Sequence, residues 1–468
     1  MSTPNTNHGA EAVLRYVDQA RRVFFLGIGG VSMCSLAELT KKIGKETAGY
    51  DRTLTPVTRR LADMGISIVS DEGVHVRAGD AVVYTVAISP EHPDYVAAQE
   101  MNLPLISRAD YLGAVMCRYG CRMGVSGMHG KSTTTAMLAA ICEAAGVNPT
   151  VFAGAAIPAY GSTCKLGGED YFVFEACEYM DSFLSFNPTC AIVLNVEADH
   201  LDYFTSMEHI RTSFGRFLGR TGAAENAMAI VNGDDKETMT AAQAYGGKKI
   251  TFGLSAGVDY RAENVSASAT GTSFDVRRHG ELLAHVTLRS VGVHFVSDAL
   301  AAFAAACENG ISPTAAAEGL AAYEGAQRRM EKKGTLSCGA DVYEDYAHHP
   351  TEIRASLAAA RLMGYGRILC AFQSHTYSRT ALLYDDFITA FGETDVLWFA
   401  PIYAAREENV YGLDEAKFAR DAGAVALPSF DAVAECIRAE AKAGDMVILM
   451  GAGDINQVTK LLNCYFTL

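Results

Sequence analysis

Residues 124–135 combine glycine, lysine and hydroxyl side chains in an order that suits phosphate binding. The segment reads Gly-Val-Ser-Gly-Met-His-Gly-Lys-Ser-Thr-Thr-Thr, and an apolar run typical of a buried helix follows it. In such a loop backbone N–H groups face an anion, Lys131 reaches the outer phosphates and the Ser132 hydroxyl can ligate Mg²⁺. The usual spacing would place a glycine at Val125, so a purely structural glycine turn remains an alternative. The candidate phosphate-binding residues are Gly127, Met128, His129, Gly130, Lys131, Ser132 and Thr133.

Acidic side chains and a histidine follow two apolar runs after this loop. Glu175 ends the run at 171–175, and His200 comes shortly after the run at 190–195. Carboxyl ends of parallel strands meet at the edge of a sheet where ligands of open α/β folds bind. Because Mg²⁺ prefers oxygen ligands, Ser132 and Glu175 are the predicted metal ligands, with His200 a less usual nitrogen ligand. Helix-capping acids and a surface histidine are the alternative. The acids at the two ends are Glu175, Glu178, Glu197 and Asp199.

The amino-terminal part of the chain carries a second glycine-rich turn. An apolar strand at 22–29 enters it, and a helix is predicted to begin after Gly30. Gly29 and Gly30 match a dinucleotide-type turn, although Ser32 replaces its third glycine, and Asp51 follows at the distance of a ribose-binding acid. The pattern fits any nucleotide diphosphate at a helix N-terminus. A dinucleotide oxidoreductase is therefore one hypothesis, but it leaves the phosphate loop at 124–135 unexplained.

The segment at 343–352 reads Tyr-Glu-Asp-Tyr-Ala-His-His-Pro-Thr-Glu and precedes a predicted helix. His348 and His349 could ligate a metal, but no third ligand lies at a useful spacing. Hydrogen bonding to a substrate is at least as good an interpretation.

Strands alternate with helices along most of the chain, which predicts parallel sheets in an α/β protein. The pattern is interrupted at 258–290, where antiparallel hairpins are predicted, and an apolar helix follows at 294–307. We expect three domains, at 1–112, 113–324 and 325–468.

Composition narrows the class of protein. The chain has 468 residues, about half of them apolar, and a net charge of −15. This length suggests two to four domains, and the charge argues against generic nucleic-acid binding. The first twenty residues do not resemble a secretory signal and no apolar run reaches membrane-spanning length, so we expect no membrane insertion. Twelve cysteines without a paired framework are typical of reduced thiols in a cytoplasmic protein.

The order of these motifs resembles that of the Mur ligases along nearly the whole chain. The histidine pair before proline and the Gly-Ile-Gly-Gly turn resemble the branch that adds L-alanine to UDP-N-acetylmuramate. The resemblance implies an N-terminal Rossmann-like domain for the UDP-sugar, a central P-loop ATPase-like domain and a C-terminal Rossmann-like domain for the amino acid. The matching segments are 25–30, 127–134, 175–178, 195–203, 328–329, 345–352, 372–375, 378–380, 402–407 and 451–455.

The resemblance also implies a reaction, with ATP and Mg²⁺ as cofactors. ATP phosphorylates the lactyl carboxylate of UDP-N-acetylmuramate, and the amine of L-alanine then displaces phosphate. A carboxylate is a poor electrophile at neutral pH, so its oxygen must become a leaving group while water is excluded. Lys131 is expected to neutralise the moving phosphoryl group. Ser132, Glu175 and His200 are expected to hold Mg²⁺.

The remaining roles follow from the same resemblance. Arg328 or Arg329 adds positive charge from the domain junction, and Asp345 orients the nucleotide. His348 and Arg379 hold the amino acid, whose carboxylate suits a guanidinium group. The contacts expected on the UDP-sugar side are Gly29, Gly30 and Asp51.

Four positions depart from the family pattern. A helix expected to begin His-Asn-x-x-Asn, where it contacts the adenine nucleotide, here has Phe295 and Asp298. Tyr50 replaces a serine before Asp51, and Thr376 replaces an arginine common in relatives. These changes keep two alternatives open: a divergent ligase with another substrate, and a non-catalytic nucleotide-binding copy. The sequence is compatible with a monomer or a homodimer.

Overall fold

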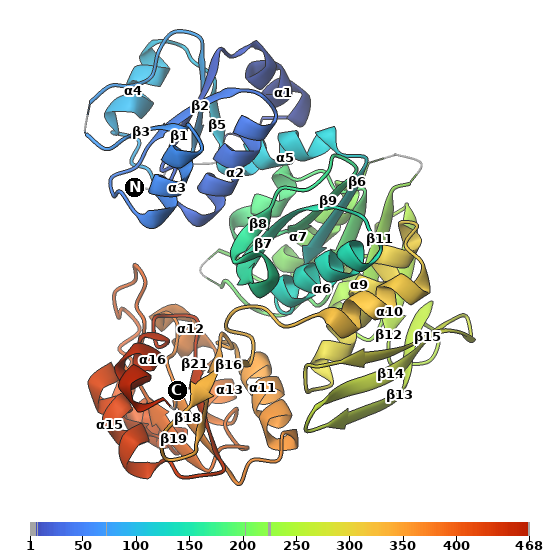
Figure 1. Cartoon of the computed structure of the whole chain (residues 1–468), viewed down its shortest axis with the longest axis vertical. Helices are drawn as coiled ribbons and strands as arrows, with labels where there is room; N and C mark the ends of the chain where they lie inside the picture. The colour runs from blue at the N-terminus through green and yellow to red at the C-terminus, as the bar shows by residue number, and fades with distance from the viewer. Residues whose placement is uncertain (1–5, 7, 72, 202, 223–225, 467–468) are drawn as a thin grey trace.

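The computed structural model describes residues 6, 8–71, 73–201, 203–222 and 226–466. Figure 1 shows an N-terminal domain in blue, a central domain from green to yellow and a C-terminal domain from orange to red. Each contains a sheet with helices packed beside it, so the predicted three-domain α/β fold class is confirmed. No helix in the described part of the chain is long and apolar enough to cross a membrane.

The N-terminal domain is a parallel sheet with strand order β3-β2-β1-β4-β5. Its central strand β1 reads Arg-Val-Phe-Phe-Leu and is buried along its whole length, as expected for a strand covered on both faces. Helix α3 begins at a capping box in which Thr55 and Thr58 bond reciprocally, with Pro56 in the first turn. The elements are α1 (Ala10–Gln19), β1 (Arg22–Leu26), α2 (Val31–Lys42), β2 (Glu46–Tyr50), α3 (Pro56–Asp63), β3 (Ser67–Val69), β4 (Asp80–Tyr84), α4 (Pro93–Glu100), β5 (Leu105–Ser107) and α5 (Arg108–Val115).

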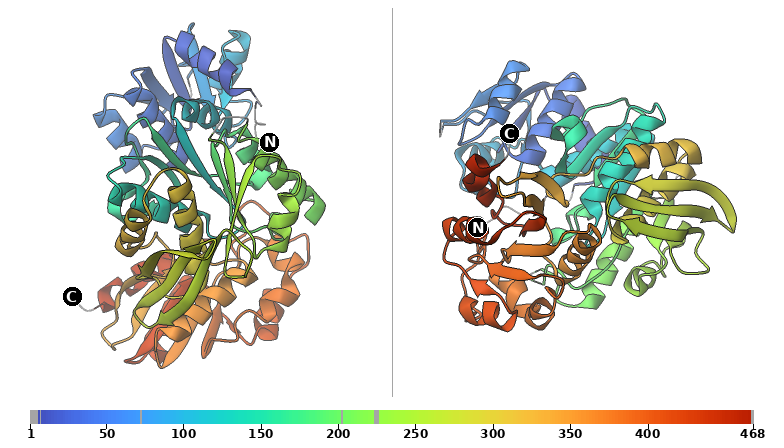
Figure 2. Two further views of the ribbon diagram at one scale, coloured as in Figure 1. Left: turned by 90° about the vertical axis from the view of Figure 1, so that its right-hand side faces the viewer. Right: turned by 60° about the horizontal axis from the view of Figure 1, so that its bottom comes forward.

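The central domain holds a mixed sheet with the order β15-β14-β13-β12-β11-β10-β6-β9-β7-β8. Parallel strands surround β6, and the antiparallel strands β13 to β15 extend from one side of the domain (Figure 2). The elements are β6 (Cys121–Ser126), α6 (Lys131–Ala144), β7 (Thr150–Ile157), β8 (Ser162–Lys165), β9 (Tyr171–Glu175), β10 (Cys190–Val193), α7 (Met207–Gly219), β11 (Met228–Asn232), α8 (Lys236–Ala241), β12 (Lys248–Gly253), β13 (Tyr260–Ser268), β14 (Gly271–Arg278), β15 (Glu281–Leu288), α9 (His294–Glu308) and α10 (Pro313–Ala322).

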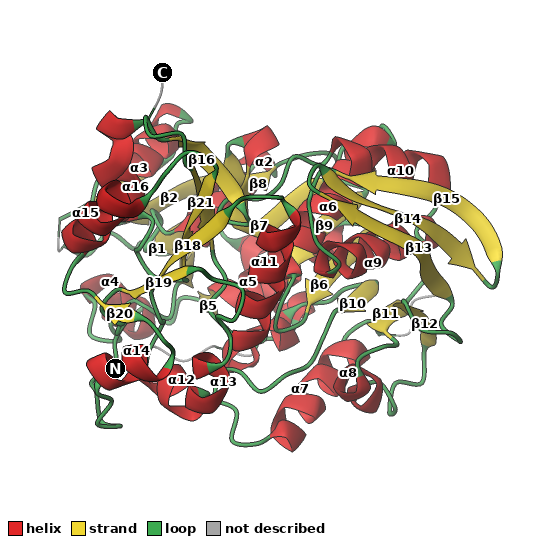
Figure 3. Cartoon of the chain, turned by 90° about the horizontal axis from the view of Figure 1, so that it is seen from below, coloured by secondary structure: helices red, strands yellow, loops and turns green. Residues whose placement is uncertain are grey.

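The C-terminal domain has the strand order β16-β17-β21-β18-β19-β20, in which only β16 runs antiparallel to its neighbour. Seen from below, α11 lies between this sheet and the helices of the central domain (Figure 3). The elements are β16 (Glu331–Thr335), β17 (Asp341–Asp345), α11 (Pro350–Leu362), β18 (Arg367–Phe372), α12 (Tyr377–Leu382), α13 (Tyr384–Ile388), β19 (Val396–Phe399), α14 (Glu415–Asp421), β20 (Val425–Ala426), α15 (Phe430–Glu440), β21 (Asp445–Met450) and α16 (Gln457–Leu462). Short 3₁₀ helices lie at Met116–Arg118, Pro158–Tyr160, Tyr179–Ser185 and Asn463–Tyr465.

The apolar runs of the sequence form helices and strands that are buried in the domain cores. Helix α9 has an almost wholly buried face of alanine, leucine and phenylalanine, and it packs with α6 and α10 against the central sheet. Burying such a helix removes apolar surface from water, at about 25 cal/mol per Å². The predicted hairpins at 258–290 are confirmed as β13 to β15.

Candidate active site

The glycine-rich segment forms a loop at the carboxyl end of β6, between β9 and β10 in the sheet. Gly127 and Gly130 have φ of 139° and 83°, a region that favours glycine. Asn195, which follows β10, holds the loop in place: its side-chain oxygen accepts a hydrogen bond from the His129 N–H at 2.8 Å. Gly130 then leads into α6. The loop therefore presents the positive N-terminal end of a long helix, which suits a phosphate group.

Lys131 lies inside this loop and faces a buried acid. Its Nζ is 2.6 Å from the carbonyl oxygen of Gly127 and 3.0 Å from Oε1 of Glu178. Burial lowers the pKa of Lys131, but Glu178 and the neighbouring Cys177 and Glu175 together outweigh this effect and leave the pKa above its ordinary value. His200 Nε2 lies 3.3 Å from the same Oε1 atom. Glu178 thus joins the lysine of the loop to the histidine that follows β10.

Glu175 contacts the other candidate metal ligand. The Ser132 hydroxyl donates to Glu175 Oε2 at 2.7 Å, and the Gly154 N–H donates to the same oxygen at 2.8 Å. A β-carbon on Gly154 would lie 2.4 Å from that oxygen, so only glycine lets β7 approach so closely. A hydroxyl and a carboxylate beside a phosphate loop form the kind of oxygen set that Mg²⁺ prefers.

A cavity of about 410 Å³ brings these groups together. The cavity is bordered by the start of α2 from the N-terminal domain, by the phosphate loop and strand ends of the central domain, and by the start of the C-terminal domain. Residues from all three domains line it: Val31, Lys131, Ser132, Glu175, Glu178, Asp199, His200, Arg328, Arg329, Tyr346, His348 and Glu352.

A second cavity of about 180 Å³ opens on the other side of the loop. Asp345 ends β17 at its wall, where it accepts N–H bonds from Met330 at 2.8 Å and Ala347 at 2.7 Å. Burial raises the pKa of Asp345. Two of the four departures from the family pattern lie here as well. Phe295 is buried with its ring 4.1 Å from that of His294, and the Asp298 carboxylate lies against Gly130.

The two arginines of the domain junction lie over one aromatic ring. Arg328 and Arg329 have their guanidinium carbons 4.9 Å and 5.1 Å from the ring centre of Tyr346. Arg328 donates to the Gly451 carbonyl, whereas Arg329 lies 3.8 Å from Glu352 and borders both cavities. Arg329 is therefore the better placed of the two to add positive charge to both cavities.

His348 and Arg379 approach the site through a shared acid. Arg379 Nε donates to Asp199 Oδ1 at 3.0 Å, and His348 contributes positive charge to the same carboxylate. Burial raises the pKa of Asp199, but Arg379, His200 and His348 together outweigh this effect, and the pKa lies well below its ordinary value. Arg379 borders a third cavity of about 450 Å³, which shares Asp199 and His200 with the loop cavity.

The N-terminal glycine turn lies at the start of α2, directly before Val31, which lines the loop cavity. The Gly29 N–H donates to Asp51 Oδ2 at 2.8 Å, and Gly30 precedes the first residue of the helix. A β-carbon on Gly29 would lie 2.9 Å from the Asp51 carboxylate. In this conformation Asp51 therefore binds the turn itself.

Models of three Mur ligase domains match the chain. The family's catalytic domain matches residues 22–120, its middle domain matches 125–306, and its glutamate ligase domain matches 328–453. A UDP-N-acetylmuramate–L-alanine ligase from Acetivibrio thermocellus is 38% identical over 449 residues, covering 94% of this chain and 95% of the relative.

The chain belongs to the Mur ligase family.

Other relatives and solved structures agree with this assignment. A UDP-N-acetylmuramate–L-alanine ligase from Clostridium novyi is 38% identical, covering 95% of this chain and 97% of the relative. The crystal structure of a UDP-N-acetylmuramate–alanine ligase from Thermotoga maritima has a TM-score of 0.77 at 25% identity and covers 94% of this chain and 98% of that one. A murein peptide ligase from Psychrobacter arcticus has a TM-score of 0.70 at 25% identity and covers 95% and 98%.

Three acids of this Mur ligase site were not among the predicted site residues. Glu178 contacts both Lys131 and His200, and Asp199 contacts Arg379. Glu352, in α11 of the C-terminal domain, contacts His129 of the loop. Glu178 and Asp199 stand within three residues of predicted ligands, so their position at the strand ends was a usable signal. Glu352 was visible only as the fourth residue after His348, a spacing that also fits a helix-capping acid.

Proposed function

We propose that this Mur ligase joins L-alanine to the lactyl carboxylate of UDP-N-acetylmuramate through an acyl phosphate formed with ATP. The observation that carries this proposal is the loop cavity, in which Lys131, two candidate magnesium sites and groups from all three domains face one space. Relatives that share 36–38% identity over nearly the whole chain are ligases of this name. ATP use is common to the family.

The phosphate loop supplies charge and orientation for phosphoryl transfer. The N–H groups at the start of α6 and the Lys131 ammonium group face the phosphates, and Arg329 adds a second cation from the domain junction. Because phosphoryl transfer needs mainly positioning and charge neutralisation, these fixed groups are sufficient to stabilise the developing charge. Glu178 holds Lys131 in place before the nucleotide binds.

The oxygen atoms beside the loop fit Mg²⁺. Ser132 and Glu175 offer one hydroxyl and one carboxylate, and Glu178 with His200 offers a second carboxylate and an imidazole. The cavity leaves room for the phosphate oxygens and waters that an octahedral ion also needs. Bound there, Mg²⁺ would neutralise phosphate charge. We therefore propose Ser132 and Glu175 for one ion, and Glu178 and His200 for another.

The amino acid and the UDP-sugar enter from the flanking domains. We propose that Arg379 binds the carboxylate of L-alanine through its planar guanidinium, with His348 beside the same acid, Asp199. Asp345 is proposed to orient the nucleotide. Gly29, Gly30 and Asp51 are proposed for the diphosphate and uridine side. Burial between three domains keeps water from the acyl phosphate.

The same assignments lead to proposals for the domain boundaries, the location and the oligomeric state of the protein. We propose domain boundaries near 112 and 324, a cytoplasmic location where UDP-sugar precursors are made, and a monomer or homodimer.

Phosphate release from ATP tests the proposal. Purified protein is given Mg²⁺, UDP-N-acetylmuramate and one amino acid at a time. Release that requires both the UDP-sugar and L-alanine supports the proposal, and serine and glycine measure selectivity for a methyl-sized side chain, worth about 1–3 kcal/mol. Absence of turnover with retained ATP binding points to a non-catalytic copy, and consumption of a reduced nicotinamide cofactor to an oxidoreductase.

One observation favours a second candidate. The cavity beside Arg379 has about 450 Å³, more than a single alanine fills, and a murein peptide ligase is among the similar structures. Turnover with a murein tripeptide and none with L-alanine would assign the chain to peptide ligation.

A further inference from the structure

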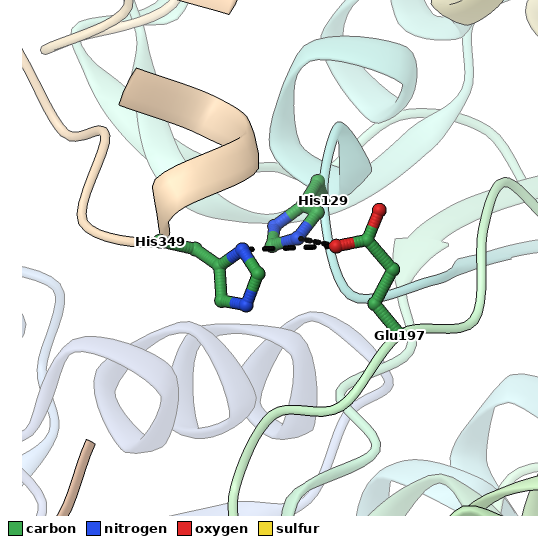
Figure 4. Close-up of side chains that lie close together, drawn as sticks. All are labelled: His129, Glu197 and His349. Carbon is green, nitrogen blue, oxygen red and sulfur yellow. Dashed lines mark hydrogen bonds and ion pairs between the residues drawn. The ribbon is translucent and has the colours of Figure 1, made fainter. Parts of the chain in front are cut away.

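Three metal-binding side chains meet where the C-terminal domain contacts the phosphate loop. His129 comes from the loop, Glu197 follows β10, and His349 precedes the first turn of α11 (Figure 4). One ligand atom of each lies within 4.8 Å of the others. His129 Nε2 is 3.4 Å and His349 Nδ1 is 3.7 Å from Glu197 Oε2. The proposed ligase chemistry uses none of these three side chains.

We propose that His129, Glu197 and His349 form a site for a divalent cation of the zinc class, separate from the magnesium sites. Ligands of a tetrahedral zinc ion at about 2.0–2.2 Å lie about 3.3–3.6 Å from one another. Two of the observed separations already fall close to this range, so small side-chain movements complete the site. Two imidazoles and a carboxylate leave a fourth position for water. Mg²⁺ fits this set poorly, because it prefers oxygen ligands.

The surroundings favour a positive charge at this position. Glu352 Oε1 lies 3.2 Å from His129 Nδ1, on the opposite side of the ring from Glu197. Each nitrogen of the His129 ring thus faces a carboxylate, which favours a cation here. A metal ion would replace the proton on Nε2.

Neighbouring groups are arranged to orient the ligands. The Glu352 carboxylate on Nδ1 of His129 matches the carboxylate–histidine–metal arrangement common in zinc sites. Thr351 donates its hydroxyl hydrogen to Glu197 Oε2 at 2.9 Å. The Thr351 N–H also donates to His349 Nδ1 at 3.3 Å, so a bound ion has to displace one long helix-capping bond. The His349 side chain is buried, with an exposed fraction of 7%.

The three ligands of the proposed site come from two domains. Glu197 and the phosphate loop belong to the central domain, whereas His349 belongs to the C-terminal domain, and His129 and Glu197 border the cavity beside Asp345. An ion held by all three ligands ties the two domains together at the edge of the proposed nucleotide site.

Cobalt binding tests the site without relying on ligase activity. The nucleotide-free protein is titrated with Co²⁺ in excess Mg²⁺, and the visible bands of low-coordinate Co²⁺ are recorded. We expect one equivalent to bind. Glu197→Gln and His349→Asn should each weaken binding at least about tenfold. Asparagine is a good helix cap, so His349→Asn removes the imidazole while keeping the start of α11. The matched control is His285→Gln, which alters an exposed histidine paired with Asp275 and should leave binding unchanged.

Two results would overturn the proposal. One is Co²⁺ binding of equal strength in wild type, Glu197→Gln and His349→Asn. The other is loss of the cobalt bands in His200→Gln alone, which would place the ion at Glu178. X-ray absorption of the zinc-loaded wild type needs no variant. Two imidazole ligands support the site, and a shell of oxygen atoms alone contradicts it.

Discussion

Replacing Asp298 by asparagine should stabilise the protein, and the gain should grow as the pH rises. Asp298 is 8% exposed at the start of α9 and lies against Gly130 of the phosphate loop. Burial raises its pKa from an ordinary 3.8 to about 7, although the positive charge of Arg329 opposes the change. The carboxyl is therefore neutral in the native state at mildly acid pH and ionised in the unfolded chain.

The sign of the effect follows from linkage. A raised pKa means that the protonated carboxyl favours the native state below pH 3.8, and that this contribution is lost as the pH rises through about 7. At about 1.4 kcal/mol per pKa unit, the complete loss is about 4 kcal/mol. Asparagine stays neutral, so Asp298→Asn keeps that contribution at all pH values. Between about pH 5.5 and about pH 8.5 its advantage over wild type should grow by about 2 kcal/mol.

Denaturant unfolding of both proteins at the two pH values measures this growth. Asp445→Asn is the matched control: Asp445 is also buried, but its carboxylate lies 2.6 Å from Arg367 and its pKa is lowered by that hydrogen bond. It should lose stability at neutral pH, opposite to Asp298→Asn. A stability difference for Asp298→Asn that is independent of pH, or a loss that deepens as the pH rises, would refute the reasoning.

Three further predictions concern the proposed chemistry. Lys131→Ala should lower ATP turnover at least about a hundredfold, because it removes the cation nearest the phosphates, and normal phosphate release in this variant contradicts its role. Gly154→Ala places a β-carbon 2.4 Å from Glu175 Oε2, so the Mg²⁺ concentration for half-maximal activity should rise about tenfold; an unchanged magnesium titration argues against Glu175 as a ligand. Arg379→Lys loses the planar fork toward a carboxylate and should raise KM for L-alanine about tenfold with a smaller change in kcat; an unaltered KM places the amino acid elsewhere.

The sequence was sufficient to predict the groups that follow buried parallel strands. Strand β9 ends at Glu175, and the turn after β10 carries His200, because apolar runs bounded by polar residues fix where such strands stop. The loop before α6 was also predictable, since its glycines and Lys131 lie close together in the chain.

Contacts between distant segments could not be predicted in this way. Glu352 is 223 positions from His129, and their contact depends on how the C-terminal domain packs against the phosphate loop. Glu178, rather than Glu175, pairs with Lys131, although the two acids are only three positions apart in the chain. No local pattern encodes either arrangement.

Isotope transfer tests the central claim most directly. UDP-N-acetylmuramate carrying ¹⁸O in its lactyl carboxylate is incubated with ATP, Mg²⁺, L-alanine and the protein, and the released phosphate is analysed by mass spectrometry. An acyl phosphate predicts that one labelled oxygen leaves with the phosphate as the amide bond forms. Phosphate without label, in a reaction that still forms the amide, would contradict activation of the carboxylate in the cavity around Lys131.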